Sequence, residues 1–205
     1  MKKVSVIMAS FLGFYPGRAS NPEKKFIRAV NSFLSQTYEN KELIIVADGC
    51  DMTEIIYNKY FSDKKSIKFI KIDKQPIYSG EMRNAGLRLA DGDIISYLDN
   101  DDVIGKKHIE TIMEQFSDDV DLVYYDDYVV HSSDFKKLYR RVNDLKYGGI
   151  GTSSITHRNV EWVSWRDGYG HDFFFIISLV MNGMRFEKIK KSPSYLVCHT
   201  GNTDF

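Results

Sequence analysis

Three aspartates stand close together directly behind an apolar run of the sequence. Residues 93–98 read DIISYL, and Asp99, Asp101 and Asp102 follow at once. Like charges at this spacing raise one another's pKa and repel, so the cluster is costly unless a cation or a helix terminus offsets it. An Asp-x-Asp pair offers the oxygen ligands that Mg²⁺ and Mn²⁺ prefer, and such an ion would bridge to a diphosphate. The structural alternative is a solvated turn, with Asp102 capping a helix from Ile104 onward.

Polar side chains also follow two other runs of β-branched residues. Ser10 comes after the run at residues 4–8, and Asp48 comes after the run at residues 43–47. A carboxylate at a strand end can accept the ring N–H of a uracil, thymine or guanine base. Asp48 could equally be a turn residue beside Gly49. In a parallel sheet such strand ends share one edge, which is where α/β proteins bind ligands.

Two charged side chains further along the chain could act on a substrate. Arg83 lies in a predicted helix, where it could complement a phosphate or a base, or extend along the surface. Asp172 directly precedes the apolar stretch FFFIISLVM. It could cap a buried helix there, worth about 1 kcal/mol, or serve as a general base, and the two roles are compatible.

Strands and helices alternate along the first two thirds of the sequence. Short β-branched runs predict strands at residues 4–8, 43–47, 67–72, 93–98 and 121–130. Apolar residues at helical spacing predict helices at residues 26–34, 80–92 and 109–116, the second of them ended by Gly92. This order predicts an α/β fold with a mainly parallel central sheet flanked by helices.

Composition favours one domain with a full core. Of the 205 residues 43% are hydrophobic, and 28 basic residues balance 28 acidic ones, so no overall charge draws the chain to nucleic acid or to an anionic membrane. Cys50 and Cys198 lack metal-ligand spacing and indicate a reducing compartment, with a single disulfide as the alternative. No apolar stretch is long enough to span a membrane. The N-terminal MKKVSVIMASFLGF is better explained as a buried strand than as a signal peptide.

Several spaced motifs, in this order, resemble the family 2 glycosyltransferases of the GT-A fold. KKVSVIMASF resembles the family's first strand, AVNSFLSQTYENKELIIVADGCD its helix and second strand, and GEMRNAGLRLADGDIISYLDNDD the segment ending in Asp-x-Asp. GHDFFFIISLVMNG is similar to the motif that supplies the catalytic base, and YLVCHTGNTD to a C-terminal stretch with a histidine. The resemblance implies a nucleotide-diphospho-sugar transferase fold in a single domain at 1–205, with 1–102 binding the nucleotide and 103–205 the acceptor.

The resemblance also implies a role for each matching residue. Asp172 matches the general base, and the implied cofactor is Mn²⁺ or Mg²⁺. The metal ligands would be Asp99, Asp101 and His199, and the nucleotide contacts would be Ser10, Asp48, Arg83 and Asp99. His199 could instead be an ordinary terminal residue, and Asp102 would be structural. Trp162, Trp165 and Tyr169, just before the base, could stack on an acceptor sugar or serve packing.

The implied reaction is an inverting transfer of a sugar from a nucleotide-diphosphate sugar to a hydroxyl of a saccharide or lipid-linked acceptor, in polysaccharide or surface glycan synthesis. A ring N–H contact at Asp48 favours a UDP-sugar. Such an enzyme would be cytoplasmic, with peripheral association at the inner face of the membrane. The alternatives are a non-catalytic nucleotide-sugar-binding scaffold of a polysaccharide assembly complex, and a sugar-phosphate nucleotidyltransferase. The latter needs a glycine-rich phosphate loop, which ASFLGFYPGR imitates only loosely.

The sequence departs from the family pattern at three places. Ala47 precedes Asp48 where the family often has two acidic residues, so only one carboxylate can face the base. Ala9 and Ser10 stand where proline and threonine are usual. The loop at residues 12–25 is longer than typical, which suits a plain surface loop, a lid or an acceptor contact. The sequence ends soon after the histidine motif, as in a minimal enzyme or a fragment of a longer one.

Overall fold

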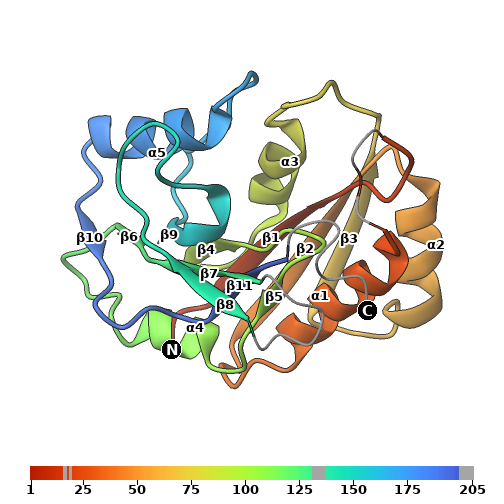
Figure 1. The fold of residues 1–205 in the computed structure, drawn as a ribbon, viewed down its shortest axis with the longest axis horizontal. Coiled ribbons are helices and arrows are strands. Elements are labelled where there is room, and N and C mark those ends of the chain that lie inside the picture. Colours follow the sequence, from red (N-terminus) through yellow and green to blue (C-terminus); the bar gives the residue numbers. More distant parts are fainter. Residues whose placement is uncertain (16–17, 19, 131–136, 199–205) are drawn as a thin grey trace.

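The computed structural model describes residues 1–15, 18, 20–130 and 137–198, and strands alternate with helices through its first half (Figure 1). The elements are β1 (Val4–Ser10), α1 (Pro22–Leu34), β2 (Lys41–Asp48), α2 (Asp51–Tyr60), β3 (Ile67–Ile72), α3 (Glu81–Leu89) and β4 (Ile94–Tyr97). The second half is richer in short strands. Its elements are β5 (Val103–Ile104), α4 (His108–Met113), β6 (Leu122–Tyr124), β7 (Asp127–Val130), β8 (Leu138–Arg141), a 3₁₀ turn (Thr152–Ser154), β9 (Ile155–Arg158), α5 (His171–Met181), β10 (Phe186–Lys188) and β11 (Tyr195–Val197).

The larger of two sheets has seven strands in the order β10-β6-β9-β4-β1-β2-β3. Strand β1 runs parallel to β2 and β4, β2 runs parallel to β3, and β9 is antiparallel to its neighbours β4 and β6. The predicted α/β fold with a mainly parallel central sheet is therefore confirmed. A smaller sheet has four strands in the order β5-β11-β7-β8.

Helices cover both faces of the large sheet because side chains alternate along each strand. Val4, Val6 and Met8 of β1 pack in one core cluster with residues of α1, α2 and α4. Ile7, between them in sequence, belongs to the opposite cluster with α5. In Figure 1, α3 and α5 accordingly lie above the sheet and α1 and α4 below it. Each apolar face thus finds a helix to pack against.

The predicted strand at residues 121–130 is two strands in the structure. β6 belongs to the large sheet and β7 to the small one. Asp126, which lies between the two strands, and Asp127, the first residue of β7, are buried. Asp126 pairs with Arg140 and Lys188, and Asp127 pairs with Arg141. Buried carboxylates must have partners. Ion pairs with distant parts of the chain therefore outweigh the local preference for one continuous strand.

The predicted helix at residues 80–92 ends at Leu89, before Gly92. A side chain at Gly92 would come within 2.6 Å of the Ser5 hydroxyl, and the Gly92 N–H donates to that hydroxyl at 2.9 Å. This glycine is needed for close approach to β1, and the prediction that it ends the helix was wrong.

Two expectations from composition can be compared with the described residues. Cys50 and Cys198 are both buried free thiols, as the prediction without a disulfide requires. In the ranges that the structure describes, no helix has both the length and the apolar character to cross a membrane.

Candidate active site

The ends of β1, β2 and β4 meet at one edge of the large sheet, as their parallel pairing requires. Ser10 and Asp48 are the last residues of β1 and β2, and Asp99 follows β4 within two residues. Ser10 itself is buried, where its hydroxyl lies 3.2 Å from that of Thr53 and accepts from the Asn100 amide at 3.3 Å. Its hydroxyl therefore ties β1 to the residues that follow β4.

Asp99, Asp101 and Asp102 form a turn, hereafter the acidic turn, between β4 and β5. The Asp99 N–H donates to the Tyr195 hydroxyl at 3.0 Å, and the Asp102 carboxylate accepts from the Cys198 N–H at 2.7 Å. Asp102 is buried and does not cap a helix, because Ile104 enters β5 and pairs with Tyr195 of β11. The interpretation of Asp102 as a helix cap was wrong, although its role is structural.

The acidic turn brings three carboxylates together, and the positive charges of Lys25 and Arg28 near Asp101 and of Arg83 near Asp99 only partly offset the effect of burial. Burial and mutual repulsion raise the pKa of Asp99 and Asp102 above their usual values, and burial raises the pKa of Asp101. Among the described residues, the ion pair to this turn is the Arg83 guanidinium, 3.8 Å from the Asp99 carboxylate. Arg28 of α1 donates to the Asp101 backbone carbonyl at 2.8 Å, which fixes the turn.

Arg83 is held at the site by aromatic packing. Its guanidinium lies 4.7 Å from the Trp165 ring centroid, a cation–π contact. Trp165 is 3% exposed, stacks on Phe175 at 3.8 Å, and donates its indole N–H to the Tyr97 hydroxyl at 3.1 Å. Of the two roles open for Trp165, packing is the one that it has. Through Arg83, the buried tryptophan positions a cation between the acidic turn and α5.

Asp172 lies in the first turn of α5, close to this cation. Residue 170, a glycine in the left-handed conformation (φ 76°), is the N-cap of the helix, and Asp172 makes no capping hydrogen bond. The predicted cap is therefore wrong. Its Oδ1 instead accepts from the Thr152 hydroxyl at 2.5 Å and lies 3.0 Å from His171 Nε2.

The surroundings of Asp172 keep it ionised. Burial acts against its charge, but the hydrogen bonds from His171 and Thr152 and the positive charge of Arg83 hold the pKa of Asp172 below its usual value. Within the described part of the chain both contacts go to Oδ1, which leaves Oδ2 to receive a proton. Thr152 could not have been found from the sequence, because no motif marks the turn that carries it.

Asp48 has partners of its own in the structure. Its carboxylate accepts from Lys74 Nζ at 2.5 Å and from the Gln75 N–H at 2.6 Å. These contacts hold the segment after β3 against the end of β2. The base contact expected of Asp48 stays a prediction, and a bound base would have to share this carboxylate with Lys74.

Two of the three predicted metal ligands belong to the described residues. Asp99 and Asp101 lie together in the acidic turn, whereas His199 is outside the described residues. Across the described ranges, no set of three His, Cys, Asp or Glu side chains is arranged to hold a metal ion. The structure thus brings Arg83, Asp99, His171 and Asp172 together, with Asp101 next to them and Asp48 at the neighbouring strand end.

These acidic and basic groups lie at the carboxyl edge of a mainly parallel sheet, which is where α/β proteins bind their ligands. The profile of the family described as Glycosyl transferase family 2 matches residues 18–192, most of the chain. The chain therefore belongs to glycosyltransferase family 2, as the motifs predicted.

Two curated relatives have sequences similar to this chain, and a solved structure has a similar fold. The chain is similar to the poly(ribitol-phosphate) beta-N-acetylglucosaminyltransferase TarP of Staphylococcus aureus, with 30% identity over 114 residues, 55% of this chain and 32% of TarP. It is also similar to chondroitin synthase of Escherichia coli, with 31% identity over 105 residues, 51% of this chain and 15% of that protein. The crystal structure of S. aureus TarS 1–349 in complex with UDP-GlcNAc matches with a TM-score of 0.71 and 21% identity over 96% of this chain and 58% of that one. This last likeness confirms the predicted GT-A fold. The matched segments make up well under half of both curated relatives.

Proposed function

We propose that this protein is a metal-dependent, inverting glycosyltransferase that moves a sugar from a UDP-sugar to a hydroxyl of a saccharide or lipid-linked acceptor in polysaccharide synthesis. Membership of family 2 and the names of TarP and chondroitin synthase support the reaction class. A UDP-GlcNAc complex of a protein with the same fold supports the donor. The observation that carries the proposal is the grouping of an ionised Asp172 with Arg83 and the acidic turn.

The acidic turn has the chemistry that a hard divalent cation needs. Asp99 and Asp101 offer carboxylate oxygens, and burial raises the pKa of both carboxyl groups, so a nearby cation would favour their ionised forms. These two residues, with His199 as a third ligand, would hold Mn²⁺ or Mg²⁺. Bound there, the ion would supply positive charge that stabilises a departing diphosphate.

The chain's own residues account for the rest of the transfer. Oδ2 of Asp172 accepts the proton of the acceptor hydroxyl while the hydroxyl oxygen forms its bond to the anomeric carbon. The bond from that carbon to the diphosphate oxygen breaks on the opposite face, which inverts the centre and releases UDP. His171 and Thr152 fix the Asp172 carboxylate through Oδ1. Arg83 adds positive charge between base and leaving group, where it favours the charged transition state.

Replacing Asp172, the proposed base, should reduce sugar transfer while leaving UDP binding nearly unchanged. Asp172→Asn keeps the shape and the Thr152 contact but cannot take a proton, so transfer falls by about 10²–10⁴-fold. UDP affinity, measured by calorimetry with Mn²⁺ present, stays within about twofold because the acidic turn is intact. Asp63→Asn, an exposed carboxylate before β3, is the matched control and keeps full activity. Ample transfer by Asp172→Asn would refute the assignment.

A further inference from the structure

Two open cavities meet at Asp172. One is lined by aromatic residues, including Tyr78, Tyr147 and Tyr169, and is called the tyrosine cavity below. The other is lined by Arg141, Asn143 and a run of glycines, and is called the glycine cavity. Gly148, Ile150 and Asp172 line both. The carboxylate proposed as the base therefore lies where the two cavities join.

The tyrosine cavity is built from three loops that are distant in sequence. Tyr78 and Tyr169 meet edge to face with centroids 5.5 Å apart, and Tyr147 packs edge to face on Phe173 at 5.6 Å. Tyr169 is nevertheless 74% exposed, and about half of Tyr78 and of Tyr147 is open to solvent. Because ring contacts hold these exposed tyrosines in place, they can present large flat faces and hydroxyls to a ligand at a low cost in conformational entropy.

Backbone strain supports a functional reason for this arrangement. Tyr78 has a φ of 62°, in the left-handed region that a bulky side chain rarely adopts, and its carbonyl accepts from the Gly168 N–H at 3.0 Å. Such strain costs of the order of 1–3 kcal/mol and tends to persist at binding sites. Gly170 is also left-handed, and a side chain there would come within 2.9 Å of the Tyr147 ring. The left-handed conformations of Tyr78 and Gly170 thus go with the placement of the Tyr78 and Tyr147 rings in the cavity that Asp172 also lines.

The glycine cavity continues past Asp172 with satisfied polar groups. The Arg141 guanidinium makes a two-pronged contact with Asp127, and the Asn143 amide donates to the Tyr125 carbonyl and to the Ser154 hydroxyl. The charge of Arg141 is thus already compensated. Gly148, Gly149 and Gly151 leave the wall without side chains, so a second ring has room beside the first.

We propose that the two cavities together bind an oligosaccharide acceptor of at least two sugar residues. This inference rests on the proposed function. One sugar stacks on the tyrosines and presents its hydroxyl to Asp172, and the next sugar occupies the glycine cavity. A monosaccharide would fill only one cavity and would lose the contacts of the other, so chain length becomes part of acceptor selection.

Saturation-transfer NMR on the full chain, with UDP and the diamagnetic ion Mg²⁺ present, tests this. The probes are mono-, di- and tetrasaccharides of glucose, galactose, N-acetylglucosamine and N-acetylgalactosamine. At least one di- or tetrasaccharide should bind about tenfold or more tightly than its monosaccharide. Tyr147→Ala and Tyr169→Ala should each weaken that binding about three- to tenfold, the range of single aromatic contacts. Tyr60→Ala, a half-exposed tyrosine at the end of α2, is the matched control.

The saccharide measurements test the two-cavity acceptor site, and the UDP measurements test the proposed function. Equal binding of mono- and oligosaccharides, unchanged affinity in both tyrosine variants, or no saccharide binding while UDP still binds would overturn the two-cavity acceptor site alone. Failure to bind UDP or any UDP-sugar, measured by calorimetry on the same sample, would overturn the proposed function. Thermal unfolding confirms that each variant is folded, and Tyr169→Ala removes the most exposed of the three rings.

Discussion

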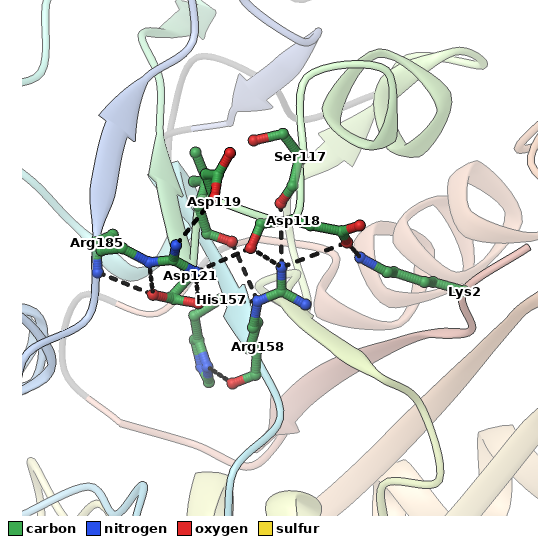
Figure 2. A network of polar contacts seen from close by, with 9 residues as sticks. Lys2, Ser117, Asp118, Asp119, Asp121, His157, Arg158 and Arg185 are labelled. Carbon is green, nitrogen blue, oxygen red and sulfur yellow. Dashed lines mark hydrogen bonds and ion pairs between the residues drawn. The ribbon is translucent and has the colours of Figure 1, made fainter.

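Two groups of three aspartates lie in different parts of this molecule and differ in their partners. The acidic turn (Asp99, Asp101, Asp102) follows β4. The second group, Asp118, Asp119 and Asp121, precedes β6 and is called the paired loop here (Figure 2). Figure 2 shows guanidinium groups of Arg158 and Arg185 on both sides of Asp121. Similar local sequences thus end in opposite electrostatic environments.

In the paired loop, cations from distant segments neutralise the charge. Asp121 accepts from Arg185 Nε at 2.8 Å and from Arg158 Nε at 2.9 Å, and these contacts, that of Arg185 first, lower the pKa of Asp121 to about 2. Asp118 and Asp119 are 94% and 96% exposed, so water screens them. In the acidic turn, burial raises the pKa values instead. A cluster of carboxylates favours a cation site where burial raises the pKa values and the nearby cations do not offset that rise.

Removing Asp101, a proposed metal ligand, should give the largest difference between the two groups. In Asp101→Ala, UDP affinity in the presence of Mn²⁺ falls by at least about 10–100-fold, the size of effect known for residues that support metal ligands. Calorimetry with and without the metal measures it. Asp119→Ala in the paired loop is the control and binds UDP as the parent does, because its side chain is exposed. Equal effects of the two changes would remove the functional distinction.

Removing the central charge of the paired loop should affect stability alone. Asp121→Asn leaves Arg158 and Arg185 without a charged acceptor and lowers the free energy of unfolding by about 2 kcal/mol at pH 7. Because the folded-state pKa is depressed, this contribution is present above the unfolded pKa near 4 and fades as pH falls toward about 2. Urea unfolding at several pH values checks both statements. An unchanged midpoint at pH 7 would show that the pairing contributes nothing.

The corresponding change in the acidic turn should have the opposite sign and a smaller size. Without metal, Asp99→Asn removes a carboxylate whose pKa burial raises to about 6, with help from Asp101 and Asp172. We expect a gain of about 1 kcal/mol at pH 7, a modest figure because 46% of the side chain is exposed. The cost of ionised Asp99 is full above pH 6 and fades between about 6 and 4, so the gain shrinks over that window. Destabilisation by Asp99→Asn at pH 7 would contradict this.

Local patterns in the sequence were enough to predict the sheet and the edge of the site. Strand runs ending in Ser10, Asp48 and Asp99 had to converge once the strands were parallel, and they do. The details depend on contacts between distant segments. Thr152, which fixes Asp172, lies 20 residues from it in sequence, and Arg28 reaches the Asp101 carbonyl across 73 residues. No periodicity or motif encodes such pairs.

Two predictions were wrong because contacts between distant segments of the chain decide the local structure. Asp102 looked like a helix cap because a polar residue precedes an apolar run, but β11, from the far end of the chain, pairs with that run and makes it a strand. The strand at residues 121–130 divides because Arg140, Arg141 and Lys188 bury the two aspartates in its middle. Local propensity is a weak guide wherever a buried charge has a distant partner.

We propose that a divalent ion, shared with a diphosphate, adds positive charge at the acidic turn. Thermal unfolding with UDP, in Mn²⁺ and again in EDTA, tests it most directly. At 100 times the dissociation constant, bound UDP adds about 2.7 kcal/mol, and each kcal/mol raises the Tm of a chain of this size by about 2–4 °C. We predict this rise with Mn²⁺ and little or none in EDTA. An equal rise in both conditions would contradict the claim.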